Sequence, residues 1–563
     1  MKLRKLKILN FRGIRNLEIN LNDTTVLIGE NNSGKTTILD ALRLCLRDLG
    51  PRRRAVFEPF DFHLKDADAE PATAEPIEIT ITFSEDTAGE WEDRLVRQLN
   101  RYKMLQIDDE GRNHVVLQVT CNYDAASREF EQNWKFLNLA GQPLAGVPET
   151  ALNLLQSEVS YYYLTALRDA FRHFDAKGPF WRPFLKDSQL SEEKKAEIEQ
   201  KLREVNNLVV ASHTSFNQVR ERLNKVQNIV SMASDDMVSI EAVPGRMFDM
   251  LAKAQIYLGA STSAKVPIHR HGEGTQSLAV LMLFSAFLDA WPQGVPIIAL
   301  EEPEAHLHPS AVRTLWGVLD GITGQKLIST HSGDLLSKVP ADALCRLART
   351  PTGIQAFKLK RETLSSDEVR KFNYHIRLTR GELLFARCWL LVEGETEVTL
   401  LPEIASHLRI DLEQAGVRCV PHRHASIELF LKVARDLGIA WCVLADNDDQ
   451  GEPDQKHAKS YSGDLQDLLY VMPENDIEGH LCSAGFGSIY EAYLSEQTRK
   501  QVTVSKDDTQ YWPQILKAIK KTREFSKPGA ALKVIDTIKI GFQPVPPLLE
   551  NVVRRAVALA GGG

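Results

Sequence analysis

The sequence has no closely spaced cysteines of the kind that hold a structural metal. Its seven cysteines are scattered along 563 residues, and no two of them form a C-x-x-C pair. This pattern argues against structural zinc and against a disulfide framework, and it suits the reducing cytosol. The sequence also lacks an excess of positive charge, since its formal net charge is −7. Any surface for nucleic acid must therefore be a local basic patch.

Long hydrophobic runs are missing as well. The most apolar stretch, Ser277 to Trp291, carries Asp289 and is too short to cross a bilayer, so it predicts a buried helix. The first residues, Met1 to Phe11, contain no apolar segment long enough for a signal peptide. We therefore expect a soluble cytoplasmic protein with no membrane partner. Because the chain is too long for one core, two or three domains are expected.

A glycine-rich segment between an expected strand and an expected helix is the strongest motif in the chain. The apolar run Val26 to Ile28 leads into GENNSGKTT, residues 29–37, and helix formers follow. This matches G-x-x-x-x-G-K-[ST], in which backbone N–H groups face the phosphates of a nucleotide. We expect Lys35 to reach the outer phosphates and the Thr36 hydroxyl to bind Mg²⁺. The residues predicted to bind ATP here are Asn31, Asn32, Ser33, Gly34, Lys35, Thr36 and Thr37.

Strand patterns surround this motif. Residues 3–8 alternate apolar and basic side chains, and a second strand is expected to end near Leu21. The strand before the P-loop is therefore predicted to be third in a sheet that begins antiparallel. Further strands are expected at 75–83 and 114–121. Residues 1–150 are interpreted as the N-terminal part of an ATPase domain.

Residues 190–230 carry a heptad-like pattern in two arms. Apolar side chains recur every three or four residues from Ile198 to Val209, and again from Phe216 to Val230. The two arms predict a helical hairpin that packs on itself or on a second copy. Ordinary amphipathic helices lying on the domain are the alternative. We interpret residues 151–250 as a helical insertion used for dimerisation.

The ATPase domain is expected to resume over residues 251–380. A fully apolar strand at 296–300 ends in Glu301 and Glu302, where an acidic pair would hold Mg²⁺ and polarise the attacking water. A second apolar strand is followed by His331, which is placed to reach a γ-phosphate. Before both, the segment GEGTQS, residues 272–277, opens a helix and predicts an anion site.

The last third, residues 381–563, alternates strands and helices in the manner of a small parallel α/β domain. One apolar strand ends in Glu393, and another ends in Asp446 and Asp448. Side chains two apart on a strand share a face, and parallel neighbours would bring Glu393 beside them. Clustered carboxylates repel one another unless a divalent cation neutralises them, and oxygen ligands favour Mg²⁺ or Mn²⁺.

More charged residues follow and suggest a second ion. Its candidate ligands are Glu397, Asp476 and Glu478. Two such ions would bind a scissile phosphate, activate water and stabilise the leaving oxygen. Lys527 is the candidate cation that supports the transition state, although a surface position among many lysines is the plain alternative.

The order of P-loop, GEGTQS, acidic pair and histidine resembles the ABC-type ATPases of the SMC/Rad50/RecF group. That resemblance implies that Gly274 and Gln276 complete the nucleotide site of a second copy, and that Glu302 is the hydrolytic base. Two features depart from the group, because Glu301 stands where Asp is usual and no Q-loop glutamine is evident. The motifs VEGETE and ADND resemble the Toprim domain of primases, topoisomerases and some nucleases.

The two halves together resemble the OLD (overcoming lysogenization defect) family of nucleases. This resemblance implies an α/β fold with an SMC-like ATPase and a C-terminal Toprim domain, ATP-linked and metal-dependent DNA cleavage, and dimers or higher oligomers. The family includes the nuclease component of Gabija anti-phage systems, which works beside a helicase-like partner. The leading hypothesis is an ATP-regulated endonuclease. A topoisomerase or primase, and an ATP-gated DNA-binding scaffold with a non-catalytic Toprim fold, are the alternatives.

Overall fold

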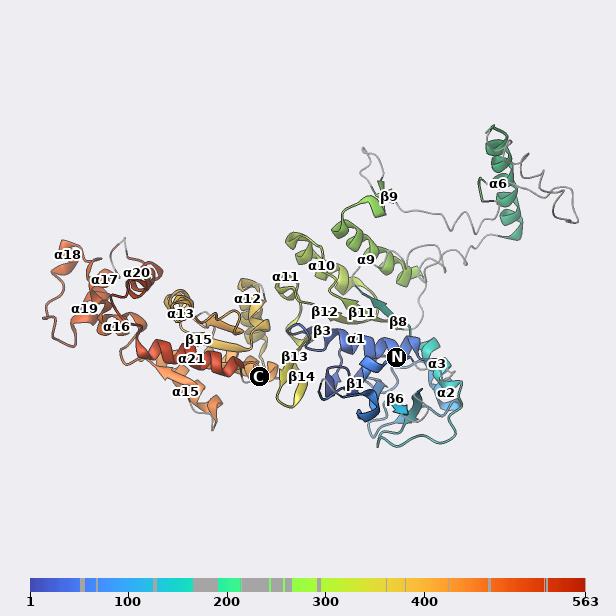
Figure 1. Cartoon of the computed structure of the whole chain (residues 1–563), viewed down its shortest axis with the longest axis horizontal. Helices are drawn as coiled ribbons and strands as arrows, with labels where there is room; N and C mark the ends of the chain where they lie inside the picture. Colours follow the sequence, from blue (N-terminus) through green and yellow to red (C-terminus); the bar gives the residue numbers. More distant parts are fainter. Residues whose placement is uncertain are drawn as a thin grey trace, which may run out of the picture.

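A computed structural model describes most of the chain. The described residues are 1–563 without 51–55, 67–68, 125–128, 166–190, 213, 215–241, 245–256, 259–265, 291–294, 361, 380, 424, 464–466, 521, 523–524 and 562–563. Three larger sheets organise these residues, and Figure 1 shows the C-terminal lobe, in orange and red, at one end of the long axis and the other two sheets toward the opposite end.

The first sheet is antiparallel, with strand order β2-β1-β4-β6-β5, and β7 pairs with β6. Along β4 every second residue is buried, so one face of this sheet packs on the core and the other faces outward. The helix α2, Asp93–Arg101, follows β4. The strands are β1 Leu3–Phe11, β2 Ile14–Asn20, β4 Ile77–Ser84, β5 Gln106–Ile107, β6 Asn113–Asp124 and β7 Glu129–Leu137.

The second sheet carries the P-loop strand β3, Thr24–Ile28. Its order is β14-β13-β3-β12-β11-β8, and β3 pairs in parallel with β12 and β13. The prediction that β3 is third in the antiparallel sheet is therefore wrong. All four residues from Thr25 to Ile28 are buried, which requires a sheet covered on both faces. The remaining strands are β8 Tyr161–Leu164, β11 Ile297–Glu301, β12 Gln325–Ser329, β13 Leu344–Thr350 and β14 Gly353–Lys358.

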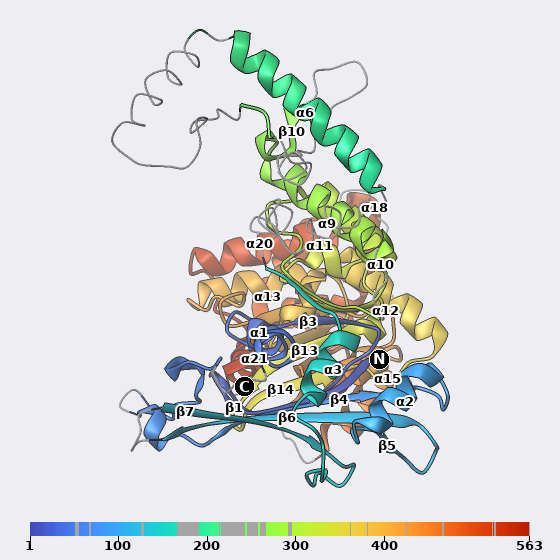
Figure 2. The same ribbon diagram turned by 90° about the vertical axis from the view of Figure 1, so that its right-hand side faces the viewer.

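Two hydrophobic cores cover the two faces of this second sheet. Leu27 and Ala299 pack with α1, Lys35–Arg43, and with the buried face of the first sheet. Val26 and Ile298 pack on the opposite face with helices and with part of the C-terminal lobe. Figure 2 shows the first sheet as a separate layer next to the second. The helices on this opposite side are α9 Glu273–Ala290, α10 Pro309–Gly321, α11 Gly333–Leu336 and α12 Ser366–Leu378.

The segment interpreted as an insertion begins inside the ATPase core. The helix α3, Ala151–Glu158, packs in the core and β8 pairs with β11, so the sheet extends into the range 151–250. Beyond it, the first heptad arm is helical as α6, Glu192–Ser212, which lies away from the body of the chain in both views. The second arm, residues 216–230, lies outside the described residues. A short hairpin follows, with β9 Tyr257–Leu258 and β10 Val266–Pro267.

The C-terminal lobe is a parallel four-stranded sheet in the order β16-β15-β17-β18. The sequence pattern predicts strands at 389–392, 417–420 and 440–445 and helices at 396–407 and 426–437, and the structure confirms each of them to within one residue at either end. Strands are β15 Cys388–Val392, β16 Val417–Pro421, β17 Ala440–Ala445 and β18 Leu469–Val471. Helices are α13 Glu395–His407, α14 Ile427–Leu437, α15 Gly451–Ser462, α16 Ile477–Leu481, α17 Gly487–Glu491, α18 Glu496–Arg499, α19 Tyr511–Ile519, α20 Lys527–Lys539 and α21 Pro547–Gly561.

The ATPase sheet and this lobe share one continuous core, in which Leu344 of β13 and Trp389 of β15 both take part. The other face of the lobe's sheet packs on α13, α20 and α21. Among the described residues, every helix is too short or too polar to cross a bilayer.

Candidate functional site

The P-loop connects β3 to α1 in the conformation that its glycines allow. Gly34 has φ 94° and stands at the N-cap of α1, a left-handed position that favours glycine. Lys35 Nζ donates hydrogen bonds to the carbonyl oxygens of Gly29 and Glu30, both at 2.8 Å. Burial lowers the pKa of Lys35 to about 8, and the nearby Glu302 and Glu30 offset part of that shift. A nucleotide phosphate would offer this ammonium a charged acceptor in place of the two neutral carbonyl oxygens.

The other predicted ATP-binding residues divide into exposed and buried groups. Ser33 and Gly34 are buried in the loop, Asn31, Asn32 and Thr36 are exposed, and Thr37 is half-buried. Exposed Asn32 has φ 63°, which asparagine tolerates better than most residues. The loop therefore presents its backbone and Thr36 outward at the positive end of α1.

The acidic residue Glu301 meets the P-loop directly. It ends β11, two strands away from β3 in the same sheet, and Thr36 Oγ1 donates a hydrogen bond to its carboxylate. Tyr163 of β8 donates to the other carboxylate oxygen at 2.8 Å. The two groups expected to share Mg²⁺ are thus neighbours. Tyr163 was not predicted from the sequence, since nothing in the apolar run around it marks its partner.

Glu302 and His331 stand together at the ends of β11 and β12. His331 Nε2 lies 3.6 Å from Glu302 Oε1, and Glu302 has φ 46°, a strained position for a residue other than glycine. Behind them lies Glu304, which the sequence reading passed over. Glu304 Oε1 accepts hydrogen bonds from Thr330 Oγ1 at 2.5 Å and from the His331 amide at 3.0 Å. Burial raises the pKa of Glu304 above its ordinary value.

The GEGTQS segment forms the first turn of α9. Gly272, Glu273 and Thr275 are exposed, and Gln276 Nε2 donates to the His271 carbonyl at 2.6 Å. A Cβ at Gly274 would stand 3.0 Å from the carbonyl oxygen of His306, so the helix approaches the loop after β11 closely. Participation of Gly274 and Gln276 in a second copy's nucleotide site stays a prediction.

The C-terminal lobe brings Glu393 and Asp446 together. They follow β15 and β17, which are parallel neighbours with Leu391 opposite Val443, so both strand ends open at the same edge. Asp446 is 7% exposed, and its pKa is raised by burial and then by the adjacent Glu393 carboxylate. Two carboxylates held this close favour either a shared proton or a bound cation.

Asp448 lies in the turn that starts α15. Its Oδ1 accepts hydrogen bonds from the amides of Gln450 at 3.0 Å and Gly451 at 2.8 Å. Asp448 is half-buried and keeps its second carboxylate oxygen out of these bonds. It therefore shapes the loop after β17, which ends at Ala445, and its sharing of one site with Asp446 stays a prediction.

A second group forms around Glu478 at the start of α16. This residue is 1% exposed and accepts hydrogen bonds from Thr396 Oγ1 and from Lys527 Nζ, both at 2.9 Å. Burial, with Glu478 and Glu393 nearby, raises the pKa of Glu397 to about 7. Lys527, the first residue of α20, thus contacts this acidic group through Glu478. Asp476 caps α16 by accepting from the Gly479 amide at 2.8 Å.

Two residues of this site were missed by the sequence reading. His422 follows β16, the other neighbour of β15, and its Nδ1 lies 3.6 Å from Asp454 on α15. Burial lowers the pKa of His422 to about 4, while burial and the Glu393 carboxylate raise the pKa of Asp454 to about 6. The position of His422 at a strand end was the signal that could have identified it.

The donor set fits a divalent cation. Glu393 and Asp446 offer oxygen atoms in a buried acidic environment, as hard cations such as Mg²⁺ and Mn²⁺ require. Among the described residues, no three His, Cys, Asp or Glu side chains already surround a common point. The carboxylates lie instead as the Glu393–Asp446 pair and the neighbouring Glu397–Glu478 pair.

Two family models match the chain. Residues 1–382 match the family described as protein of unknown function (DUF2813). Residues 384–448 match the TOPRIM domain described as overcoming lysogenization defect protein-like.

Relatives extend over most of the chain. The Escherichia coli K12 protein YbjD is 27% identical over 576 residues and covers 100% of both chains. The OLD nuclease of Thermus scotoductus is 25% identical over 472 residues, which is 79% of this chain and 82% of that protein. The endonuclease GajA of Bacillus cereus is 21% identical over 511 residues, with 85% and 82% covered.

Proposed function

Because this chain belongs to the DUF2813 family and is an OLD-type protein with an SMC-like ATPase domain and an OLD-like Toprim domain, we propose that it is an ATP-regulated, metal-dependent DNA endonuclease. The observation that carries the proposal is the pair formed by the buried Asp446 and the half-buried Glu393 at adjacent strand ends. A purely structural sheet gains nothing from a buried carboxylate beside a second one, since each raises the cost of ionising the other.

In the proposed nuclease site Glu393, Asp446 and Asp448 hold one divalent cation, and Glu397, Asp476 and Glu478 are candidates to hold a second. Such cations supply a nucleophilic hydroxide at neutral pH and neutralise charge on the phosphodiester. Lys527 fixes Glu478 through its 2.9 Å contact and adds positive charge beside the carboxylates. Thr396 holds the other oxygen of Glu478, which keeps that carboxylate oriented.

In the proposed ATPase site the P-loop amides and Lys35 bind the phosphates, while Thr36 and Glu301 hold the associated Mg²⁺. Glu302 would orient the attacking water, and His331, whose Nε2 lies 3.6 Å from Glu302 Oε1, would contact that water or the γ-phosphate. Gly274 and Gln276 complete the site of a second copy, so a homodimer or higher homo-oligomer is the proposed working form. Hydrolysis then opens and closes the assembly and governs DNA cleavage.

DNA is the proposed substrate because the C-terminal helical segment is locally basic. Residues 499–539 contain ten lysines and arginines but only four acidic residues, against a net charge of −7 for the whole chain. This segment includes Lys527 and Lys520, which contact Glu478 and Asp476, two of the candidate metal ligands. A basic surface beside a carboxylate site suits a polyanionic substrate. The likeness to the endonuclease GajA supports nuclease activity, and the resemblance to Gabija nucleases is the basis for proposing anti-phage defence beside a helicase-like partner.

The test is cleavage of supercoiled and linear plasmid DNA with Mg²⁺ or Mn²⁺, with and without ATP. We expect Asp446→Asn to reduce cleavage by at least about 100-fold, because outer-shell changes alone cost 10- to 100-fold at metal sites. Asp449→Asn, at an exposed neighbouring position, is the matched control and should cut normally. Glu302→Gln should change only the response to ATP. Wild-type protein that binds ATP and DNA but never cuts would instead support the scaffold alternative.

A further inference from the structure

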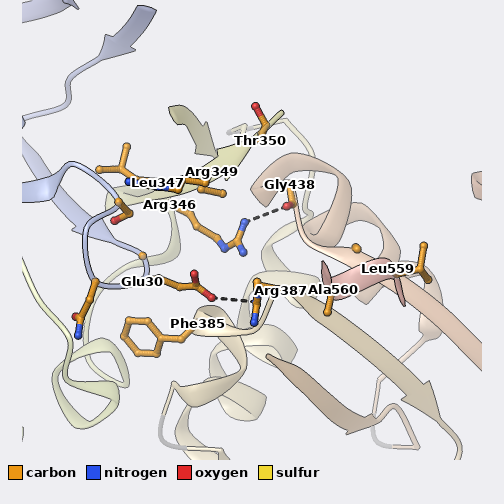
Figure 3. Close-up of a pocket in the computed structure, with 15 residues that line it drawn as sticks. Glu30, Arg346, Leu347, Arg349, Thr350, Phe385, Arg387, Gly438, Leu559 and Ala560 are labelled. Atoms are coloured by element: carbon orange, nitrogen blue, oxygen red, sulfur yellow. Dashed lines mark hydrogen bonds and ion pairs between the residues drawn. The ribbon is translucent and has the colours of Figure 1, made fainter. Parts of the chain in front are cut away.

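A cavity of about 330 Å³ lies between the P-loop and the C-terminal lobe. Its walls come from the P-loop and β13 on one side, and from the starts of β15 and β17 and the end of α21 on the other. Figure 3 shows Glu30 and Arg387 facing one another across this space, with Arg346 beside them. The cavity is bordered by charged side chains from both lobes, so it is a place where one lobe can act on the other.

Glu30 is held at both of its ends. Its backbone carbonyl accepts a hydrogen bond from Lys35 Nζ at 2.8 Å, and its carboxylate lies 3.1 Å from Arg387 Nε. Nucleotide phosphates compete for the same lysine ammonium, because a charged acceptor binds it more strongly than a neutral carbonyl. Phosphate binding therefore releases the backbone carbonyl of Glu30, the residue whose carboxylate contacts Arg387 of the C-terminal lobe.

The strand β13 gives the P-loop a second connection to that lobe. A Cβ at Gly29 would stand only 2.3 Å from the Leu347 carbonyl oxygen, so the P-loop backbone rests directly on β13. The adjacent Arg346 is 4% exposed and donates to the carbonyl oxygens of Ala386 at 3.0 Å, Leu437 at 3.1 Å and Gly438 at 2.9 Å. Leaving those carbonyls without a donor in a buried junction would be costly.

Arg387 and the residues that accept hydrogen bonds from Arg346 lie at the starts of the two strands that lead to the proposed metal-binding carboxylates. Ala386 and Arg387 precede β15, which is followed by Glu393, and Gly438 precedes β17, which is followed by Asp446. The two strand starts are also bonded to each other, since the Ala440 amide donates to the Arg387 carbonyl at 3.0 Å. A hydrogen-bonded strand pair of this length spans about 17–20 Å.

We propose that nucleotide binding at the P-loop is transmitted within one chain to the Toprim carboxylates through the Glu30–Arg387 ion pair and the Arg346 clamp. The relay rests on the proposed function and specifies its regulation. Release of the Glu30 carbonyl moves the ion pair and with it the start of β15. Arg346 couples this movement to β17, because it donates hydrogen bonds to residues before both strands. The separation of Glu393 and Asp446 changes as a consequence.

The test compares wild type with Arg387→Gln, and uses Arg418→Gln as the matched control. Arg418 also lies in the Toprim sheet and in ion pairs, and its side chain is 38% exposed against 35% for Arg387, but its ion-pair partners are Glu382 and Glu413 rather than the P-loop. Thermal unfolding checks that each variant folds, and calorimetry checks that each binds the ATP analogue AMP-PNP. Two readouts follow with and without AMP-PNP, namely hydrogen exchange of peptides covering 386–393 and 438–446, and affinity for Mn²⁺.

In wild type and Arg418→Gln we expect AMP-PNP to change the Mn²⁺ affinity by at least about 5-fold, the lower end of usual allosteric coupling, and to change exchange in both peptides. In Arg387→Gln the affinity change should fall below about 2-fold while AMP-PNP still binds. A full response in Arg387→Gln would overturn the relay and leave closure of the oligomer as the only route. The relay would also be overturned if wild-type protein bound AMP-PNP without any change in the hydrogen exchange of either peptide.

Failure of the nuclease proposal gives a different result. Wild-type protein that cleaves no DNA, yet shows an exchange response that depends on Arg387, would retain the relay and remove the endonuclease. Cleavage that responds to ATP equally in wild type and Arg387→Gln would retain the endonuclease and remove the relay.

Discussion

The two sites of this chain bury side chains of opposite charge. The P-loop site buries a cation, Lys35, among backbone carbonyls, and the C-terminal site buries an acidic residue, Asp446, against the half-buried Glu393. Burial shifts each group toward its neutral form, so the pKa of Lys35 falls and that of Asp446 rises. Each site is therefore suited to a ligand of the opposite charge, a phosphate chain in one case and a divalent cation in the other.

The sites also differ in how they are built. Most of the P-loop site is one continuous segment, whose geometry follows from its own glycines and the helix behind it. The carboxylate site draws on the ends of β15, β16 and β17 and on two helices from later in the chain. A local site can be disabled by one residue with little effect elsewhere. An assembled site depends on contacts between elements.

The largest expected effect separates the two sites through Lys35→Ala. Loss of a charge-assisted contact with phosphate should weaken ATP binding by about 10- to 150-fold, corresponding to the 1.5–3 kcal/mol typical of such bonds. Mn²⁺ binding by the protein without nucleotide should stay unchanged, because Lys35 does not touch the C-terminal carboxylates. Isothermal titration with ATP and, separately, with Mn²⁺ measures both. Undiminished ATP affinity would contradict the assignment of the P-loop.

Glu478→Gln probes the assembled site. The substitution keeps the shape of the side chain but removes the charge that Lys527 contacts, so DNA cleavage should fall by about 10- to 100-fold. ATP affinity should not change. The control is Glu403→Gln, which breaks an exposed 2.7 Å ion pair with Lys539, a lysine at the other end of the helix α20 that carries Lys527. A lowered melting temperature with normal cleavage would make Glu478 a structural residue only.

The smallest expected effect concerns pH and the Lys35 ammonium. Because the pKa of Lys35 is lowered to about 8 and phosphate binds the protonated form, ATP binding should take up a proton. Affinity should then fall by about 4-fold between about pH 7 and about pH 8.5, as the ammonium loses its proton. Titrations in buffers of different ionisation enthalpy detect the proton uptake directly. Constant affinity over this range would place the pKa of Lys35 near its ordinary value.

The sequence reading succeeded where a site or element is local. The resemblance to the OLD family and the α/β architecture are confirmed, and the strands ending at Glu301, Glu393 and Asp446 are parallel as expected. It failed on β3, whose place in the sheet depends on which strands pair rather than on the pattern of any one strand. It also passed over Glu304 and His422, because a buried polar residue without its partners in view resembles any other loop residue.

The sequence by itself determined the P-loop, the acidic strand ends and the division into two functional halves, because glycine conformations and buried strand patterns act over a few neighbouring residues. The sequence also led us to expect that Glu393 meets Asp446, whereas only the tertiary structure decided that Lys527 reaches Glu478 and that Glu30 contacts Arg387. These pairs are separated by 49 to 357 residues in the chain. Their contacts depend on strand order and on helix packing, which arise from burial of the whole hydrophobic core rather than from any single motif.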